Sequence, residues 1–219
     1  FYNENEIGFA KMLDLACGKG AEIIRMADFE NAEAFYNYIK EKGFGVVEEY
    51  LINHDKIREV YKPALNTMRM ITIIGDDGQP HLFFAAQKFG VHGRFIDVHG
   101  IHAPIDLETG VVHFPFHSGN TDTDLIYTKH PDTGYDLTEY EVPMFREAKD
   151  MILKAAMKVP EMRYVGWDVA VTNKGPKIVE GNDYTAYDYM QLPQQNPGRV
   201  GVIPDILKLV PSFKDELYK

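Results

Sequence analysis

The chain has 219 residues, of which 45% are hydrophobic and 12% aromatic, enough to bury a core in one domain or two joined lobes. Its formal net charge of −10 disfavours nucleic acid and anionic membranes as partners, because no lysine or arginine run offsets it. A single cysteine, Cys17, excludes an intramolecular disulfide and a cysteine-built zinc site. No apolar run is long enough to span a bilayer. We therefore expect a cytoplasmic small-molecule enzyme.

The N-terminal part of the chain predicts a hairpin, a helix and a strand. Residues 7–15 and 21–26 have the composition of two strands around a glycine-bearing turn. Asp28 offers an N-cap for a helix that ends near Lys42. Residues 45–51 then form an apolar strand that ends in two acids and an aromatic residue.

The rest of the chain predicts strand pairs covered by helices. In chain order, the predicted elements are a short helix at 55–61, a hairpin of 68–74 and 81–87, short strands and loops over 91–140, a helix between Pro143 and Pro160, a third hairpin of 164–171 and 176–180, and a closing helix at 203–210. Such an order of elements indicates an α+β fold.

The third hairpin gives the sharpest functional hypothesis. A three-residue loop, with Thr172 opposite Pro176, would pair Asp168 with Glu180, and such paired Cβ atoms lie roughly 4.5–5.5 Å apart. Two carboxylates at that distance repel unless a cation lies between them, and a divalent metal is the natural resolution. Asn182 shares the face of Glu180 and adds a neutral oxygen. Oxygen-only donors favour Mg²⁺, which commonly takes phosphate oxygens as further ligands, so the site implies a nucleotide. The alternative is an ordinary solvated Asp–Glu pair.

Trp167 is the neighbour of Asp168 in this hairpin. Because side chains alternate along a strand, its indole must point to the opposite sheet face. We therefore expect Trp167 to pack in the core beneath the metal site.

Four weaker features are compatible with a nucleotide. Lys11 lies in an apolar strand, where a buried ammonium needs an anion such as phosphate, unless it reaches solvent. Residues 18–20, Gly-Lys-Gly, either lay backbone N–H groups over phosphates or form a plain hairpin turn. The strand at 46–51 either hydrogen-bonds a flat heterocycle through its backbone or is an ordinary sheet edge. Arg69, in an apolar strand, is either an anion ligand or a surface arginine.

These pieces follow one another in an order that resembles the ATP-grasp superfamily. The chain is most similar to the sugar-transfer-associated ATP-grasp family, which occurs in bacterial surface-polysaccharide gene neighbourhoods, and the likeness spans nearly the whole chain. The segments that carry it are PALNTMR at 63–69, APIDLETG at 103–110, HPDTG at 130–134, RYVGWDVAVT at 163–172 and EGN at 180–182. The resemblance implies two α+β lobes whose antiparallel sheets clasp a nucleotide cleft. Residues 1–50 would form part of the first lobe, and residues 51–219 the second lobe with its Mg-binding hairpin.

The resemblance also implies cofactors, chemistry and site residues. ATP and Mg²⁺ would serve a ligase that joins a small-molecule carboxylate to an amine through an acylphosphate, in surface polysaccharide or peptide-glycan modification. The implied site residues are Lys11 and Lys19 at the phosphates, Glu48, Glu49, Tyr50 and Leu51 at the adenine, Arg69 at the transferred phosphate or acyl intermediate, with Lys11 and Arg69 catalytic, and Asp168, Glu180 and Asn182 on Mg²⁺. No nucleic acid or membrane insertion is expected, and the sequence leaves a homodimer open.

The chain departs from the family at two places. Relatives have a further N-terminal domain and a second cation upstream of the lysine strand, so we expect an N-terminally truncated piece. Residues 98–102 read VHGIH where relatives tend to show paired glycines. Two other functions stay open: a nucleotide-binding module without catalysis, and a zinc hydrolase. The ligands of such a zinc ion would be His99, His102, His113 and His117.

Overall fold

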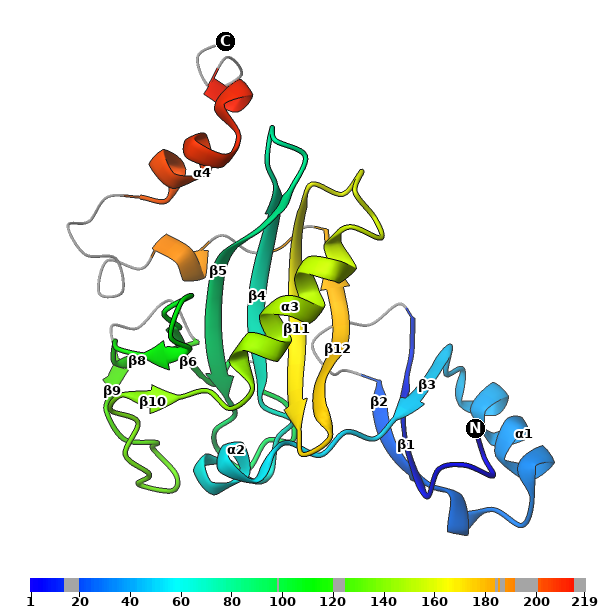
Figure 1. Ribbon diagram of the computed structural model, residues 1–219. Helices are drawn as coiled ribbons and strands as arrows, with labels where there is room; N and C mark the ends of the chain where they lie inside the picture. The colour runs from blue at the N-terminus through cyan, green and yellow to red at the C-terminus, as the bar shows by residue number, and fades with distance from the viewer. Residues whose placement is uncertain are drawn as a thin grey trace. The chain divides into compact units, whose positions relative to one another are not determined.

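The computed structural model describes residues 1–13, 20–97, 99–119, 125–183, 185, 188–191 and 201–214. The chain divides into two units, Phe1–Ile52 and Asn53–Lys219, each with its own antiparallel sheet and helices (Figure 1). In the described part of the chain, no helix has the length and apolar character needed to cross a membrane.

The described part of the first unit contains a three-stranded antiparallel sheet in the order β2-β1-β3. Its elements are β1 (Ile7–Lys11), β2 (Ala21–Arg25), the 3-10 turn η1 (Met26–Asp28), α1 (Ala32–Lys42) and β3 (Val46–Glu49). Phe35 of α1 packs with Ala10 and Ile24 of the sheet. The helix therefore covers one face of the sheet and forms the core of this unit.

Several predicted boundaries in the first unit are wrong. β1 ends at Lys11, before the predicted strand end at residue 15. The N-cap of α1 is Asn31, whose side chain accepts a hydrogen bond of 3.0 Å from the backbone N–H of Ala34. Asp28 instead ends η1, because this extra turn delays the start of the helix. β3 stops at Glu49, two residues before the predicted end at Leu51.

Among the described residues of the second unit, seven strands form one antiparallel sheet in the order β12-β11-β4-β5-β6-β8-β9. They are β12 (Gly175–Asn182), β11 (Tyr164–Thr172), β4 (Thr67–Ile74), β5 (Pro80–Phe89), β6 (Ile101–Pro104), β8 (Phe116–Ser118) and β9 (Ile126–Tyr127). The other elements are α2 (Asp55–Val60), the paired β7 (Val111–Val112) and β10 (Tyr140–Glu141), α3 (Phe145–Ala156), η2 (Asp188–Gln191), α4 (Ile203–Leu209) and η5 (Pro211–Phe213).

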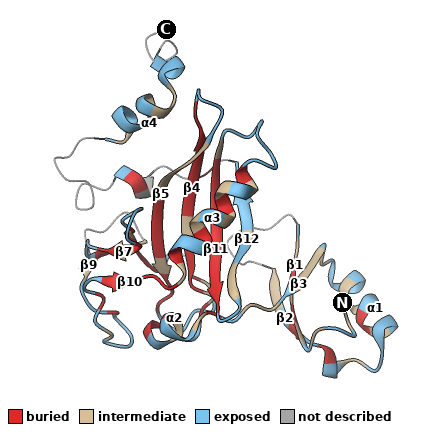
Figure 2. Cartoon of the chain, in the orientation of Figure 1, coloured by how far each residue is buried: buried red, intermediate tan, exposed pale blue. Residues whose placement is uncertain are grey.

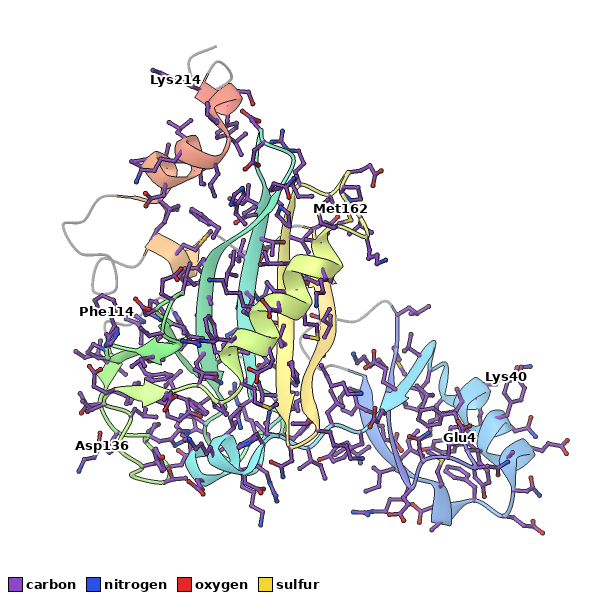
Figure 3. The ribbon with its side chains drawn as sticks, in the orientation of Figure 1. Glu4, Lys40, Phe114, Asp136, Met162 and Lys214 are labelled. Atoms are coloured by element: carbon purple, nitrogen blue, oxygen red, sulfur yellow. The ribbon has the colours of Figure 1, made fainter. Side chains whose placement is uncertain are left out.

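The helix α3 crosses one face of this sheet, over β5, β4, β11 and β12 (Figure 1). Its apolar stripe packs against alternate residues of the strands, and side chains fill the space between them (Figure 3). The core residues involved are Met68, Met70, Ala85, Val165, Trp167 and Val169 from the sheet and Phe145, Ala148, Ile152 and Ala156 from the helix. Figure 2 shows β4 and β11 almost wholly buried, whereas β12 at the edge is half-buried or exposed.

The prediction for Trp167 is confirmed. The indole lies in the core on the α3 side, and its N–H donates a hydrogen bond of 2.9 Å to the Thr72 hydroxyl. Since side chains alternate along a strand, Asp168 and its cross-strand neighbour Arg69 point to the other sheet face. That polar face carries the candidate site.

The register of the β11–β12 hairpin pairs Asp168 with Glu180, as predicted. The predicted three-residue loop is wrong, because Thr172 pairs with Gly175 across a two-residue turn. A bulge at Val179 then restores the register by inserting one residue into β12. The two one-residue differences cancel before the strands reach the carboxylates.

Candidate functional site

Arg69 and Asp168 form a bidentate ion pair at the centre of the polar face. Nε of Arg69 donates to Oδ1 of Asp168 at 3.0 Å, and Nη2 donates to Oδ2 at 3.1 Å. The side chains are 16% and 10% exposed, so water competes little for either charge. Such fork-to-fork pairing fixes the orientation of both groups. Arg69 is therefore not the free surface arginine that one alternative allowed.

Lys88 of β5 joins this pair from the neighbouring strand. Its Nζ lies 3.2 Å from Oδ1 of Asp168 and 3.3 Å from Oδ1 of Asp97, and its side chain is 12% exposed. Burial lowers the pKa of the ammonium, but the two carboxylates outweigh that effect and raise the pKa above its ordinary value. Lys88 is therefore a charged lysine at neutral pH, held between two aspartates.

Asp97 is fixed by the start of β4. Its Oδ2 accepts hydrogen bonds of 2.7 Å from both the backbone N–H and the hydroxyl of Thr67. Asp97 also opens a tight turn in which the Gly100 N–H donates to its carbonyl at 3.0 Å. A Cβ on Gly100 would lie 1.9 Å from the carbonyl oxygen of Phe89, so only glycine fits there. The turn thus sets the position of the Asp97 carboxylate against Lys88.

Thr185 adds a neutral contact to the other end of Arg69. Its hydroxyl accepts a hydrogen bond of 3.0 Å from Nη1 of the guanidinium. The threonine lies directly over Gly166, where an added Cβ would come within 2.1 Å of Oγ1. Gly166 is therefore required for the close approach that brings Thr185 to Arg69.

Glu180 and Asn182 lie on the edge strand β12, next to Asp168 of β11. Glu180 is exposed and opposite Asp168, and Asn182 is half-buried and opposite Gly166 on the same face. Nδ2 of Asn182 donates to the Gly166 carbonyl at 3.3 Å, which leaves the amide oxygen as an acceptor. Two carboxylates and an amide oxygen are a donor set that suits Mg²⁺.

One step of the sequence argument needs correction. We expected a divalent metal to be the cation that relieves the repulsion between Asp168 and Glu180. In the structure, Arg69 and Lys88 already neutralise Asp168, and Glu180 is exposed to solvent. The pairing of the two carboxylates therefore does not by itself require a metal, although the donors fit one.

The histidines of the zinc alternative do not gather into one cluster. His102 and His117 pair across β6 and β8 with ring centroids 6.0 Å apart, whereas His113 contacts Glu139 at 2.8 Å and His99 is exposed. Burial, with the charges of His117 and Lys88, lowers the pKa of His102 to about 3. Within the residues that the structure describes, no group of three or more histidine, cysteine, aspartate or glutamate side chains is arranged to hold a metal ion.

In the first unit, Lys11 has an anionic partner within the chain. Its Nζ lies 2.6 Å from Oε2 of Glu48 on the adjacent strand, and the two side chains are 26% and 37% exposed. The carboxylate therefore fills the role that the sequence argument gave to phosphate. Tyr50 and Leu51 follow β3 and are half-buried. Lys19 and its glycine turn lie outside the described residues.

Sequence reasoning missed four members of the charge network: Thr67, Lys88, Asp97 and Thr185. Lys88 had a usable signal, because it lies in an apolar strand as Lys11 does, but the predicted strand ended at Gln87. Asp97 and Thr185 lie in irregular segments, where no periodicity indicates which way a side chain points.

A profile of the family described as sugar-transfer associated ATP-grasp matches residues 20–201. Comparison with curated proteins gives no match. Among solved structures, the ADP complex of N5-carboxyaminoimidazole ribonucleotide synthetase is similar with a TM-score of 0.52 and 10% identity, over 95% of this chain and 42% of that one. A complex of the ATP-grasp ligase PsnB with a minimal precursor variant, Mg and ADP gives a TM-score of 0.43 and 14% identity, over 85% of this chain and 41% of that one. The chain thus spans less than half the length of either protein.

Proposed function

Because the chain belongs to the sugar-transfer-associated ATP-grasp family, with an α+β ATP-grasp fold, we propose that it is the nucleotide-binding part of an ATP- and Mg²⁺-dependent ligase. The reaction would join a carboxylate to an amine. The observation that carries the proposal is the register of β11 and β12, which sets Asp168 against Glu180 with Asn182 beside them. We assign Phe1–Ile52 to part of the first lobe and Asn53–Lys219 to the second.

In this proposal, each charged group has a separate task. Asp168, Glu180 and Asn182 would hold Mg²⁺, which supplies charge neutralisation for the phosphates when it is bound. Lys11 would turn from Glu48 to a phosphate, and the segment from Glu48 to Leu51 would receive the adenine.

Arg69 would steady the phosphate as it passes from ATP to the carboxylate substrate. The amine would then displace phosphate from the resulting acylphosphate and form an amide bond. A role in bacterial surface polysaccharide or peptide-glycan modification is the biological setting that we propose on the strength of the family alone.

Calorimetry of ATP binding with and without Mg²⁺ tests the metal site. We expect Mg²⁺ to raise the affinity of the wild-type chain, and Glu180→Gln to lose at least about tenfold of that gain, equivalent to 1.4 kcal/mol. Glu161→Gln removes an equal charge from an exposed residue outside the site and should leave the gain unchanged. The proposal is contradicted if the wild-type chain is folded and its ATP affinity is the same with and without Mg²⁺. ATP binding without turnover of any carboxylate would instead favour a nucleotide-binding module without catalysis.

Lys11→Met tests the phosphate contact of the first unit. The Lys11–Glu48 pair is partly exposed, so its loss should lower the free energy of unfolding by no more than about 1 kcal/mol. ATP affinity should fall about tenfold, since a phosphate loses a charge-assisted partner. Lys40→Met, on the exposed side of α1, is the matched control. Equal ATP affinity of the two variants would remove Lys11 from the nucleotide site.

A further inference from the structure

We propose that anion binding at the polar face of the second unit depends on the metal. Asp168 holds Arg69 in an ion pair until a divalent cation binds the Asp168 carboxylate. The inference rests on the proposed function, since it concerns the same Mg²⁺ and phosphate. It adds an order of binding, in which the metal comes with or before the phosphate that Arg69 contacts.

The charges of the ligand-free network cancel. Arg69 and Lys88 carry two positive charges, and Asp97 and Asp168 carry two negative charges. Each charge has an opposite partner within 3.3 Å, and the four side chains are between 7% and 16% exposed. A phosphate that approaches this network meets no net positive charge, and both oxygens of Asp168 already hold the guanidinium. Phosphate would therefore have to displace a bidentate ion pair that water screens little.

Metal binding at Asp168 would affect the charges of Arg69 and Lys88 differently. Once Asp168 turns an oxygen to the ion, Lys88 still has Asp97 at 3.3 Å and stays neutralised. Arg69 has no second carboxylate among its hydrogen-bond partners in the described residues, where its remaining partner is the neutral hydroxyl of Thr185. The metal therefore releases Arg69 but not Lys88. The released guanidinium stays fixed in place by Thr185, ready for a phosphate.

The test uses ADP binding to the whole chain, measured by calorimetry in EDTA and in Mg²⁺. Asp168→Asn removes the carboxylate that holds Arg69. We expect its ADP affinity in EDTA to exceed that of the wild type by about tenfold, and Mg²⁺ to add little. Glu180→Gln removes the same charge from a residue that does not contact Arg69, so it should lose the effect of Mg²⁺ without any gain in EDTA. Asp168→Asn/Arg69→Met should lose the gain again.

Three outcomes would overturn the inference. One is an Asp168→Asn chain that folds, as judged by circular dichroism, and gains nothing in EDTA. Another is an equal gain in Glu180→Gln, because a general change in charge would then account for both variants. The third is a gain that survives Arg69→Met. A wild-type chain that binds no ADP in either condition would instead contradict the proposed function itself.

A second measurement needs no change at Asp168. The Nε–H signal of Arg69 in a ¹⁵N NMR spectrum can be assigned by its loss in Arg69→Lys. In the free wild-type chain, Nε–H donates to Oδ1 of Asp168 at a nitrogen–oxygen distance of 3.0 Å, so the proton should exchange slowly with water. Addition of Mg²⁺ and ADP should shift the signal, whereas ADP in EDTA should not. A signal that responds equally to both overturns the inference.

Discussion

Replacing Asp97 with alanine should lower the free energy of unfolding by about 3–5 kcal/mol, the cost expected when one partner of a buried ion pair is removed. The carboxylate is 7% exposed and makes three contacts: two hydrogen bonds of 2.7 Å from Thr67 and the ion pair with Lys88. Without it, the N–H and hydroxyl of Thr67 lose their shared acceptor. Lys88 is then left with Asp168 alone, which also pairs with Arg69. Urea unfolding of the two chains measures the difference.

Asp106→Ala is the matched control for this substitution. Oδ1 of Asp106 also accepts three hydrogen bonds, from the N–H groups of Glu108 and Thr109 and from the Thr109 hydroxyl, but the residue is exposed. Water can replace these contacts, so we expect a loss of about 1 kcal/mol, typical of a capping side chain. A similar loss in both variants would mean that burial and the charge of Lys88 contribute nothing to the effect of Asp97.

The predicted pairing of Asp168 with Glu180 is correct because two one-residue errors in the predicted hairpin cancel. The turn at Asn173 and Lys174 is one residue shorter than predicted, and the bulge at Val179 adds one residue back. A bulge has no reliable signature in a single sequence, so this compensation could not be foreseen. The apolar residues around the carboxylates limited which faces could be buried, and that limit preserved the result.

The counter-charges of Asp168 could not be predicted in full. Arg69 was recognised as a candidate anion ligand, but its partner in the ligand-free chain is a carboxylate from a strand 99 residues away in sequence. The pairing depends on β11 lying next to β4, and local sequence patterns do not give the order of strands in a sheet. Asp97 depends on a tight turn whose shape follows from the close approach of Gly100 to β5.

The helix boundaries show a similar contrast between local and tertiary effects. The stop at Gly43 follows from one residue, which takes the left-handed conformation with φ 73° that glycine favours. The start depends on the turn η1, which precedes Phe29 and its contact with Phe35. Asp28 and Asn31 are both good N-cap residues, so propensity alone could not choose between them.

Gly100→Ala should destabilise the second unit by about 3 kcal/mol, the upper end of the usual range for overpacking. The added Cβ would lie 1.9 Å from the Phe89 carbonyl oxygen and 3.0 Å from that of Asp97. Both obstacles are backbone atoms, and Phe89 pairs with Ile101 in the sheet, so neither can move cheaply. Thermal unfolding followed by circular dichroism gives the change in stability.

His99→Gly is the control in the same turn. His99 is exposed and has φ 57°, a left-handed conformation that costs a residue with a Cβ roughly 1–2 kcal/mol. Glycine relieves this strain but gives the unfolded chain more freedom, so we expect no net loss of stability. A loss of stability in Gly100→Ala without a loss in His99→Gly would show that a steric contact limits the turn at Gly100, whereas backbone conformation limits it at His99. Because this turn carries Asp97, Gly100→Ala should also disturb the carboxylate that forms an ion pair with the charged Lys88. A loss of stability in His99→Gly equal to that in Gly100→Ala would contradict this account.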